Sequence, residues 1–586
     1  MTSYVFDIEA DGLKPTKMFC IVAMDTETGK FYEYGPECID KGISLLQNAT
    51  KLIGHNILGY DIPVIEKLTG VNLDDGSIKI VDTLVLSRLF NPAREGGHAL
   101  EGWGYRLRHR KIEYDNFEYY TPEMMKYCKQ DVSLNYKVYR HLTTAELPGF
   151  GPASVALEHS VYRILNAQRD KGFKLNQQHA MELLAELTGK LSQAEKEVHK
   201  TFKPRETSME LVPTFTKAGK LSKMAQVHKE TRKVRLSDEE YEKASKDPDK
   251  RLIRCDSEPF NLGSRKQIGE YLLEFGWKPK KFTPTGQPIV DEKVLSQVKN
   301  IPEAAIIAEY LMLQKRIAQI NSWFKELGDD GRIHGFVNTN GAVTGRMTHR
   351  SPNMAQVPST SSPYGKECRQ CWVVDDGYRL VGIDASGLEL RMLAHYMNDE
   401  GFTYELLNGD IHTANQNAAG LESRPQAKTF IYALWYGAGD AKLGSVVGGD
   451  AKDDGRLRQS FFDNLPAFKN LKDRVAGAAR RGYLKGLDKR KLFVRSEHAA
   501  LNTLLQGAGA IVMKQAVINL QESIKDLDAH FVANVHDEWQ IEAHKDVADR
   551  VGELGIAAIE KAGNDFNLKC SLTGEYSVGS NWYETH

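Results

Sequence analysis

The apolar segment LVGID ends on a carboxylate, Asp384, and a buried strand rarely ends this way unless a positive charge faces it. In the segment HFVANVHDEWQIEAH, two apolar strands flank His536, Asp537 and Glu538. This pattern predicts a β-hairpin with the acids at its tip, although an acidic turn is common on any protein surface. If the hairpin lies beside the strand that ends at Asp384, two aspartates can share one pair of metal ions.

Length and composition set the limits of the fold. The chain has 586 residues, which is too many for one core, and at about 150 residues per domain it should hold three or four domains. Lys and Arg total 77 against 78 for Asp and Glu, so a nucleic-acid site must come from local basic patches. The seven cysteines are scattered and odd in number, which predicts reduced thiols. With no signal peptide and no apolar run of roughly 20 residues, we expect a soluble cytoplasmic protein without a membrane contact.

Acidic residues also recur at suggestive positions in the first 150 residues. Asp7 and Glu9 are two apart on a predicted strand, so they point to the same side of it. Asp61 comes just before a helical pattern, and Tyr127 and Asp131 are four apart on one face of a predicted amphipathic helix. Taken alone, the Asp7–Glu9 pair could equally be solvated acids on a strand edge. Together, the four acids and the tyrosine predict a site for hard cations such as Mg²⁺.

A helical segment further along combines cations with aromatic rings. Arg424, Lys428, Tyr432 and Tyr436 follow each other at steps of four, so they form one winding stripe, and Ser423 is a plausible N-cap. Two cations near a helix N-terminus favour a polyphosphate site, and the tyrosines offer faces on which a base can stack. The alternative is an ordinary amphipathic helix, which does not explain why the cations and the rings share one stripe.

Residues 204–259 form a charged insert between helical patterns. Seven Lys or Arg residues lie between Lys217 and Arg235 against one acid, and an acid-rich run follows. The simplest expectation is a solvated excursion between two helices. The alternative is an arm that tracks DNA or binds a partner, because clustered Lys and Arg can neutralise phosphates without reading sequence.

The motifs DIE, HNILGYD and YCKQD resemble those of the DEDD 3′–5′ exonuclease superfamily in its tyrosine-containing form. The resemblance implies a ribonuclease H-like α/β domain over residues 1–150. In such a domain, Tyr127 would orient the attacking water, and the metal ligands would be Asp7, Glu9, Asp61 and Asp131. We expect Asp82, a further acid at a strand end, to be structural.

The motifs GIDASGLELR, RPQAKTFIYALWYG and VHDE resemble motifs A, B and C of family A (DNA polymerase I-like) DNA polymerases. Further segments, including NGAVTGRMTHRSPNMAQVP and the ending NWYETH, are similar to the replicative polymerases of short-tailed, T-seven-type bacteriophages. The resemblance implies an exonuclease domain followed by a right-hand polymerase domain. Its expected parts are the thumb (151–335), the palm (336–400 and 496–586) and the fingers (401–495).

The polymerase resemblance also implies roles for individual residues. The catalytic metals would be held by Asp384, Asp537 and the backbone carbonyl of Ala385. The incoming nucleotide would be bound by Arg424, Lys428, His412, Tyr432 and Tyr436. Lys428 would also donate a proton to the leaving pyrophosphate, and Glu389 would be the steric gate against a ribose 2′-hydroxyl. Contacts to DNA would come from Arg346, Gln506, His536 and Glu538.

The same resemblance implies cofactors and partners. We expect two Mg²⁺ ions per active site, with Mn²⁺ as a substitute, and primer–template DNA and dNTPs as substrates, in the host cytoplasm for a phage protein. A replicative helicase-primase and a processivity factor are expected partners. Phage relatives dock thioredoxin on a longer thumb insertion, so the short insert puts thioredoxin docking in doubt. The alternatives are another partner, direct clamping of DNA by the Lys217–Arg235 run, or modest processivity.

Two other classes of protein share part of this pattern. A phage-type single-subunit RNA polymerase shares the two palm aspartates and the fingers lysine, but it lacks the fused exonuclease and a gate such as Glu389. A non-catalytic replication factor on a degenerate scaffold would have lost at least one metal acid from each site. All six acids are present in this sequence.

Overall fold

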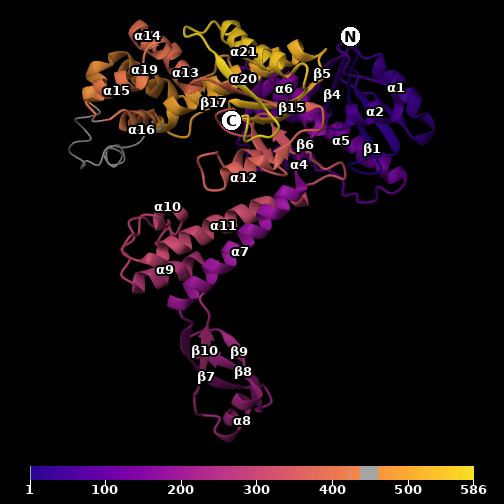
Figure 1. Cartoon of the computed structure of the whole chain (residues 1–586). Helices are drawn as coiled ribbons and strands as arrows, with labels where there is room; N and C mark the ends of the chain where they lie inside the picture. Colours follow the sequence, from indigo (N-terminus) through magenta and orange to yellow (C-terminus); the bar gives the residue numbers. More distant parts are fainter. Residues whose placement is uncertain (1, 422, 436–458) are drawn as a thin grey trace. The chain divides into compact units, whose positions relative to one another are not determined.

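The computed structural model describes residues 2–421, 423–435 and 459–586 (Figure 1). The chain divides into two compact units, one made of Met1–Gln177 with Lys325–His586 and the other of Gln178–Phe324. Within the described residues, no helix has the length and apolar character needed to cross a membrane.

The N-terminal part of the larger unit is an α/β layer structure whose sheet has the order β3-β2-β1-β4-β5. β1 pairs antiparallel with β2 and parallel with β4. Its strands are β1 (Ser3–Ala10), β2 (Met18–Asp25), β3 (Phe31–Tyr34), β4 (Lys51–Gly54) and β5 (Lys79–Asp82). Its helices are α1 (Ile39–Gln47), α2 (Asp61–Thr69), α3 (Thr83–Phe90), α4 (Leu100–Arg106) and α5 (Pro122–His141), with short turns at Pro36–Cys38 and Leu142–Glu146.

The alternation of side chains along β1 decides which helix its acids face. Phe6 and Ile8 belong to a core shared with α1 and α2, whereas Val5 belongs to a core shared with Met124 and Val132 of α5. Because the side-chain period of a strand is two, Asp7 and Glu9 share the side of Val5. They therefore face α5, the helix that carries Tyr127 and Asp131.

A second sheet, with the order β18-β19-β15-β20, lies further along the chain. β18 (Ala529–Val535) and β19 (Glu538–His544) form the predicted hairpin, and β19 pairs antiparallel with β15 (Tyr378–Ala385). On the other side, β15 pairs antiparallel with β20 (Gly574–Gly579). Two helices, α20 (Ala500–Ile524) and α21 (Ala548–Asp565), pack together and cover this sheet with a continuous apolar core (Figure 1). The predictions of the hairpin and of its position beside the Asp384 strand are both confirmed.

The segment between β15 and α20 is mostly helical. Its elements are α13 (Leu388–Met397), α14 (Glu400–Asn408), α15 (Ile411–Ala419), α16 (Arg424–Trp435), α19 (Pro466–Ala479), β16 (Tyr483–Lys485), β17 (Lys491–Phe493) and a turn at Glu497–Ala499. α16 begins as expected, because Ser423 Oγ accepts from Gln426 N (3.4 Å) while Gln426 Oε1 accepts from Ser423 N (3.1 Å). Tyr436 and the side chain of Tyr432 lie outside the described residues.

α6 (Pro152–Lys171) belongs to the larger unit, where it contacts α20 and β18. The smaller compact unit begins at Gln178 and ends at Phe324, within the range 151–335 expected for the thumb. The other elements of the larger unit are β6 (Phe173–Leu175), β11 (Arg332–Ile333), β12 (Phe336–Asn338), β13 (Thr348–Arg350), a turn at Met354–Gln356, α12 (Gly365–Gln370) and β14 (Trp372–Val373).

The smaller unit contains two long helices and the charged insert. α7 (Gln177–Thr201) and α11 (Pro302–Lys325) pack with α9 (Arg265–Glu274) and α10 (Glu292–Leu295) around one apolar core. The insert is folded and not a solvated excursion: β7 (Arg205–Phe215), β8 (Leu221–Val227), β9 (Lys233–Arg235) and β10 (Leu252–Glu258) form a sheet in the order β10-β7-β8-β9. With α8 (Asp238–Lys246), this sheet encloses a small core that includes Leu211, Ala225 and Ala244. A few apolar residues at alternating strand positions are enough to order this charge-rich segment.

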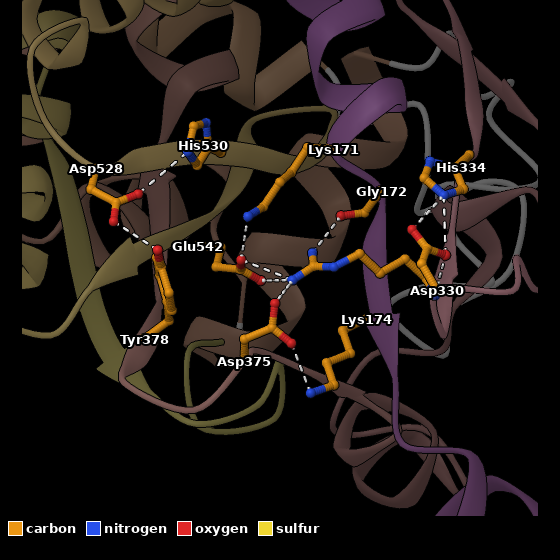
Figure 2. A network of polar contacts seen from close by, with 11 residues as sticks. Lys171, Gly172, Lys174, Asp330, His334, Asp375, Tyr378, Asp528, His530 and Glu542 are labelled. Carbon is orange, nitrogen blue, oxygen red and sulfur yellow. Dashed lines mark hydrogen bonds and ion pairs between the residues drawn. The ribbon is translucent and has the colours of Figure 1, made fainter.

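A buried ion network joins the palm-like sheet to the strands around β6 (Figure 2). The carboxylate of Glu542 on β19 is fully buried, and each of its oxygens lies 2.9 Å from Arg332 Nη2. Lys171 Nζ also reaches it at 2.7 Å. Arg332 in turn contacts Asp375 and donates to the carbonyl of Gly172 at 3.1 Å. Because Glu542 is buried between two cations, its charge is compensated only while this network holds.

We expect Glu542→Ala to lower the free energy of unfolding of the larger unit by roughly 3–5 kcal/mol, because it removes the buried carboxylate that Arg332 and Lys171 share. Glu553→Ala is the control, since its pair with Arg550 on α21 is exposed and should be worth at most about 1 kcal/mol. Urea unfolding followed by circular dichroism compares the two variants. Equal losses would contradict the central role of Glu542.

Two candidate active sites

The pairing of β15 with β19 brings two distant acids together. Asp384 lies opposite Glu538 in the register, and Asp537 occupies the hairpin turn next to it. The amide of Ala385 donates to the carbonyl oxygen of Asp537 at 3.1 Å, which ties the end of β15 to this turn. On the other side of β15, Asp384 lies opposite Glu575 of β20.

The carboxylates of Asp384, Asp537 and Glu538 lie close enough to repel one another when they are ionised. Asp384 reaches solvent, but desolvation by its surroundings, followed by the charges of Asp537 and Glu538, raises its pKa to about 7. Carboxylates in this arrangement ionise readily only when a cation shares the site. Two carboxylates and a backbone carbonyl are hard oxygen donors of the kind that Mg²⁺ prefers, so the residues present fit a divalent metal site.

Glu538 differs from the two aspartates because its partners lie inside the protein. One oxygen accepts hydrogen bonds from Gln540 Nε2 (2.7 Å) and Trp582 Nε1 and lies 3.5 Å from Arg369 Nη1. The other oxygen lies 3.0 Å from His586 Nδ1. Burial alone would raise the pKa of Glu538, but the contacts with His586 and Arg369 hold it below its ordinary value.

Glu538 is expected from the sequence to contact DNA. In this structure both of its carboxylate oxygens lie against donors within the protein. The motif analysis missed Arg369, Trp582 and His586. The NWYETH ending supported only the family resemblance, because no spacing rule connects it to the hairpin.

Several residues expected to contact DNA or nucleotide line one hollow next to Asp537. They are Arg346, Glu389, Gln506 and His536, which come from four separate segments of the chain. Arg346 Nη2 lies 2.7 Å from Glu389 Oε1, so the expected steric gate and the expected minor-groove contact are ion-paired with each other.

Three further predicted residues come together at the starts of α15 and α16. Arg424 Nε donates to Asp410 Oδ2 at 2.7 Å, and Asp410 caps α15, which carries His412. Desolvation and the nearby charges of Arg424 and Lys428 lower the pKa of His412. A cluster of this kind at two helix N-termini is suited to an anionic ligand.

The acids predicted in the N-terminal domain also converge. The amide of Ile8, which lies between Asp7 and Glu9 on β1, donates to Asp61 Oδ1 at 3.2 Å. Burial, followed by the charges of Asp61, Glu9 and Asp131, raises the pKa of Asp7 well above its ordinary value. Burial is also the main cause that raises the pKa of Glu9 to about 9 and that of Asp61 to about 7.

Two residues at this site were missed by the sequence analysis. Lys111 Nζ forms an ion pair with Asp131 Oδ2 and donates to the hydroxyl of Tyr127 at 2.9 Å. The second residue is Cys128. Its sulfur, one carboxylate oxygen of Asp7 and one of Glu9 all lie within 4.8 Å of one another. Lys111 lies in a basic segment, RLRHRK, whose function no motif indicated.

The carboxylates of the N-terminal site are only partly neutralised by the nearby cation Lys111. Among the described residues, the buried Asp131 Oδ1 has no hydrogen-bond partner, although Asp131 Oδ2 is paired with Lys111. The donors are again mainly hard oxygens, so this site also fits divalent cations.

Asp82, the acid expected to be structural, does not join the cluster. Its fully buried carboxylate accepts hydrogen bonds from the backbone amides of Asn56, Leu58, Leu84 and Val85. It therefore caps α3 and anchors the loop before α2, as predicted.

We expect Glu9→Gln to make the metal-free chain more stable at pH 8, by about 2–4 kcal/mol, because the raised pKa of Glu9, about 9 against 4.5, makes the folded wild type take up a proton that the unfolded chain has released at this pH. The folded state holds the proton that the unfolded state releases. The free energy of unfolding of the wild type therefore falls as pH rises above about 4.5. The gain should shrink at pH 5.5, and Mg²⁺ should stabilise the wild type more than the variant.

Urea unfolding in EDTA at the two pH values measures this difference, with the exposed Glu37→Gln as the control. A Glu9→Gln chain that is less stable than the wild type at pH 8 without metal would contradict the charge crowding at this site.

Comparisons with known proteins extend over nearly the whole chain. The model of DNA polymerase family A matches residues 231–584. The DNA-directed DNA polymerases of Enterobacteria phage T3 and Escherichia phage T7 are each 36% identical over 703 aligned positions, which cover 99% of this chain and 100% of the relative. The alignment is longer than the 586-residue chain, so these relatives contain segments that this chain lacks.

A solved structure shows the same fold. The polymerase domain of Pol1 from M. smegmatis, in complex with DNA primer-template and dNTP, has a TM-score of 0.77 to this chain at 19% identity. The match covers 99% of this chain and 95% of that one. The resemblance inferred from the sequence motifs is thus confirmed, and the chain belongs to DNA polymerase family A.

Proposed function

We propose that this family A polymerase replicates DNA by template-directed addition of deoxynucleotides to a primer, and that it proofreads with a separate 3′–5′ exonuclease site. The main support for the polymerase activity is the position of Asp384 at the end of β15, beside Asp537 in the hairpin turn. The convergence of Asp7, Glu9 and Asp61 supports the exonuclease reading.

In the polymerase site, Asp384, Asp537 and the carbonyl of Ala385 would hold two divalent cations, Mg²⁺ by the type of donor, with Mn²⁺ as a substitute. When bound, these ions lower the pKa of the primer 3′-hydroxyl and neutralise charge on the triphosphate. The chain's own contribution is positioning. Arg424, Lys428 and His412 bind the phosphates, and Lys428 donates a proton to the leaving pyrophosphate.

Further roles are proposed for residues that line the hollow beside Asp537. Glu389 excludes a ribose 2′-hydroxyl by occupying its space, and Arg346 holds Glu389 in place at 2.7 Å. Arg346 and Gln506 read minor-groove acceptors that correct base pairs share, and His536 lies beside the primer terminus. Tyr432 packs on the sugar, and Tyr436 stacks near the templating base.

In the exonuclease site, the four acids Asp7, Glu9, Asp61 and Asp131 would hold a second pair of Mg²⁺ ions. Tyr127 orients the attacking water through its hydroxyl. Lys111 donates to that hydroxyl and so fixes the direction in which it points.

The proposed domains follow the compact units where these differ from the sequence-based boundaries. Residues 1–150 form the exonuclease domain, and the thumb corresponds to Gln178–Phe324. The palm spans 336–400 and 496–586, and the fingers span 401–495. The folded insert, with its basic Lys217–Arg235 run, contacts DNA or a processivity partner. A replicative helicase-primase is a further candidate partner, and the short insert disfavours the docking of a thioredoxin-like factor.

One gel tests both activities. A 5′-labelled primer on a longer template is incubated with Mg²⁺, with and without dNTPs. The wild type should extend the primer with dNTPs and shorten it without them. Asp384→Asn should lose extension and keep shortening, whereas Asp7→Ala should do the reverse. Extension by Asp384→Asn at the wild-type rate would exclude the proposed polymerase site, and shortening by Asp7→Ala would exclude the proposed exonuclease site.

Glu389 provides a test of sugar selection. We expect Glu389→Ala to raise ribonucleotide incorporation relative to deoxynucleotide incorporation by at least about tenfold, because a steric or electrostatic exclusion of 1.4 kcal/mol corresponds to that factor. Single-nucleotide addition in the Asp7→Ala background measures both substrates without proofreading. Glu400→Ala, which removes an exposed first-turn acid from the neighbouring helix α14, is the control. Unchanged discrimination in Glu389→Ala would contradict the gate assignment.

A further inference from the structure

Residues 580–586 pack directly against the strands that carry the catalytic aspartates. Trp582 is fully buried, and Thr585 Oγ1 donates to Gln540 Oε1 on β19 at 2.8 Å. A Cβ atom on Gly382 of β15, two residues before Asp384, would lie 2.1 Å from the carbonyl oxygen of Thr585. Glycine is therefore required for this close approach, and the segment lies immediately behind the catalytic strand.

This segment supplies two of the groups that hold Glu538. Trp582 Nε1 donates to one carboxylate oxygen, and His586 Nδ1 lies 3.0 Å from the other. Arg369 stacks over the Trp582 ring at 4.5 Å and lies 3.5 Å from the same carboxylate, to which Gln540 of β19 also donates at 2.7 Å. Donors from three separate segments thus enclose Glu538, which is 7% exposed.

Glu538 is close enough to the catalytic aspartates for its position to matter. It lies directly opposite Asp384, and directly opposed side chains of an antiparallel pair share one face, with Cβ atoms about 5 Å apart. A freed Glu538 would be a third hard carboxylate next to Asp384 and Asp537. Mg²⁺ and Mn²⁺ both accept such ligands.

We propose that Trp582, His586 and Arg369 form a clamp that turns Glu538 away from the catalytic metals, so that Asp384 and Asp537 alone provide the carboxylates of the polymerase site. The three clamp residues are positioning residues, because they act through Glu538. This inference rests on the proposed polymerase function. Without the clamp, the extra carboxylate binds the resting metal more tightly, and binding that is not specific to the transition state slows the reaction.

The test uses the full-length chain with Asp7→Ala, Glu9→Gln and Asp61→Asn as the parent, so that the exonuclease acids do not compete for metal. Mn²⁺ binding is measured by electron paramagnetic resonance on enzyme with a dideoxy-terminated primer–template and no dNTP. Single-nucleotide addition on a normal primer gives kcat and KM for dNTP.

We expect His586→Ala to bind Mn²⁺ at least about threefold more tightly, and its kcat to fall about tenfold, as the loss of a charge-assisted hydrogen bond allows. KM for dNTP should stay within about twofold of the parent, because the fingers cations are unchanged. His586→Gln, which keeps a hydrogen-bond donor, should recover most of the loss.

The double variant Glu538→Gln/His586→Ala separates release of Glu538 from general damage. Its Mn²⁺ affinity should equal that of Glu538→Gln alone, because the carboxylate that would bind the metal is gone. His530→Ala is the matched control, since it removes a histidine–aspartate pair from the same sheet at 3.4 Å and should leave both readouts unchanged. Trp582→Phe removes one clamp donor, keeps a buried ring and should shift Mn²⁺ affinity in the same direction as His586→Ala.

Unchanged Mn²⁺ affinity in both His586→Ala and Trp582→Phe would overturn the clamp, as would a tighter affinity that persists in the double variant. If His586→Ala does not fold, judged by its melting temperature, Trp582→Phe decides the question alone. Failure of the proposed function would look different, because the parent itself would not extend a primer, or Asp384→Asn would not weaken its Mn²⁺ binding.

Discussion

The antiparallel pairing of β15 with β19 is the interaction on which the polymerase site depends. It joins segments that are far apart in the chain and places Asp384 beside Asp537, with the Ala385 amide bonded to the turn between the hairpin strands. The same pairing creates the problem that the site must manage, because acids stand on both sides of Asp384. The sheet therefore sets both the geometry of the metal ligands and the excess of negative charge that a cation must balance.

Both candidate sites handle this excess in a similar way. Each contains more carboxylates than protein cations, and each uses a few donors to decide which carboxylates stay available. In the N-terminal site, Lys111 is paired with one oxygen of Asp131, and the other has no hydrogen-bond partner within the part of the chain that the structure describes. In the palm, Arg369 and His586 hold Glu538 and leave Asp384 and Asp537 facing outward. The cations and donors around a metal site thus contribute to its specificity as much as the ligands themselves.

The insert shows where reasoning from composition is insufficient. Its charge and weak hydrophobicity favoured a solvated excursion, but the segment folds into a sheet with α8 and its own small core. Its buried apolar residues are too few to raise the average hydropathy, yet strand pairing places Leu211 of β7 opposite Val227 of β8, and Ala244 of α8 joins the same core. The helix α6 makes the same point: it continues the helical pattern of its neighbours in sequence, but packs against α20 and β18.

The sequence by itself determined the local features of this polymerase and the identity of its main acids. Period-two alternation placed Asp7 and Glu9 on one side of a strand, the acidic tip of the hairpin was readable from its flanking apolar residues, and Ser423 marked the start of α16. Those features depend on neighbours within a few positions, where backbone geometry limits the choices.

Only the tertiary structure decided that Glu538 turns inward, that Lys111 joins Tyr127, and that Trp582 and His586 lie behind Asp384. These contacts join residues with no periodic relation in the sequence, so they exist only once β-sheet register and helix packing have brought distant segments together.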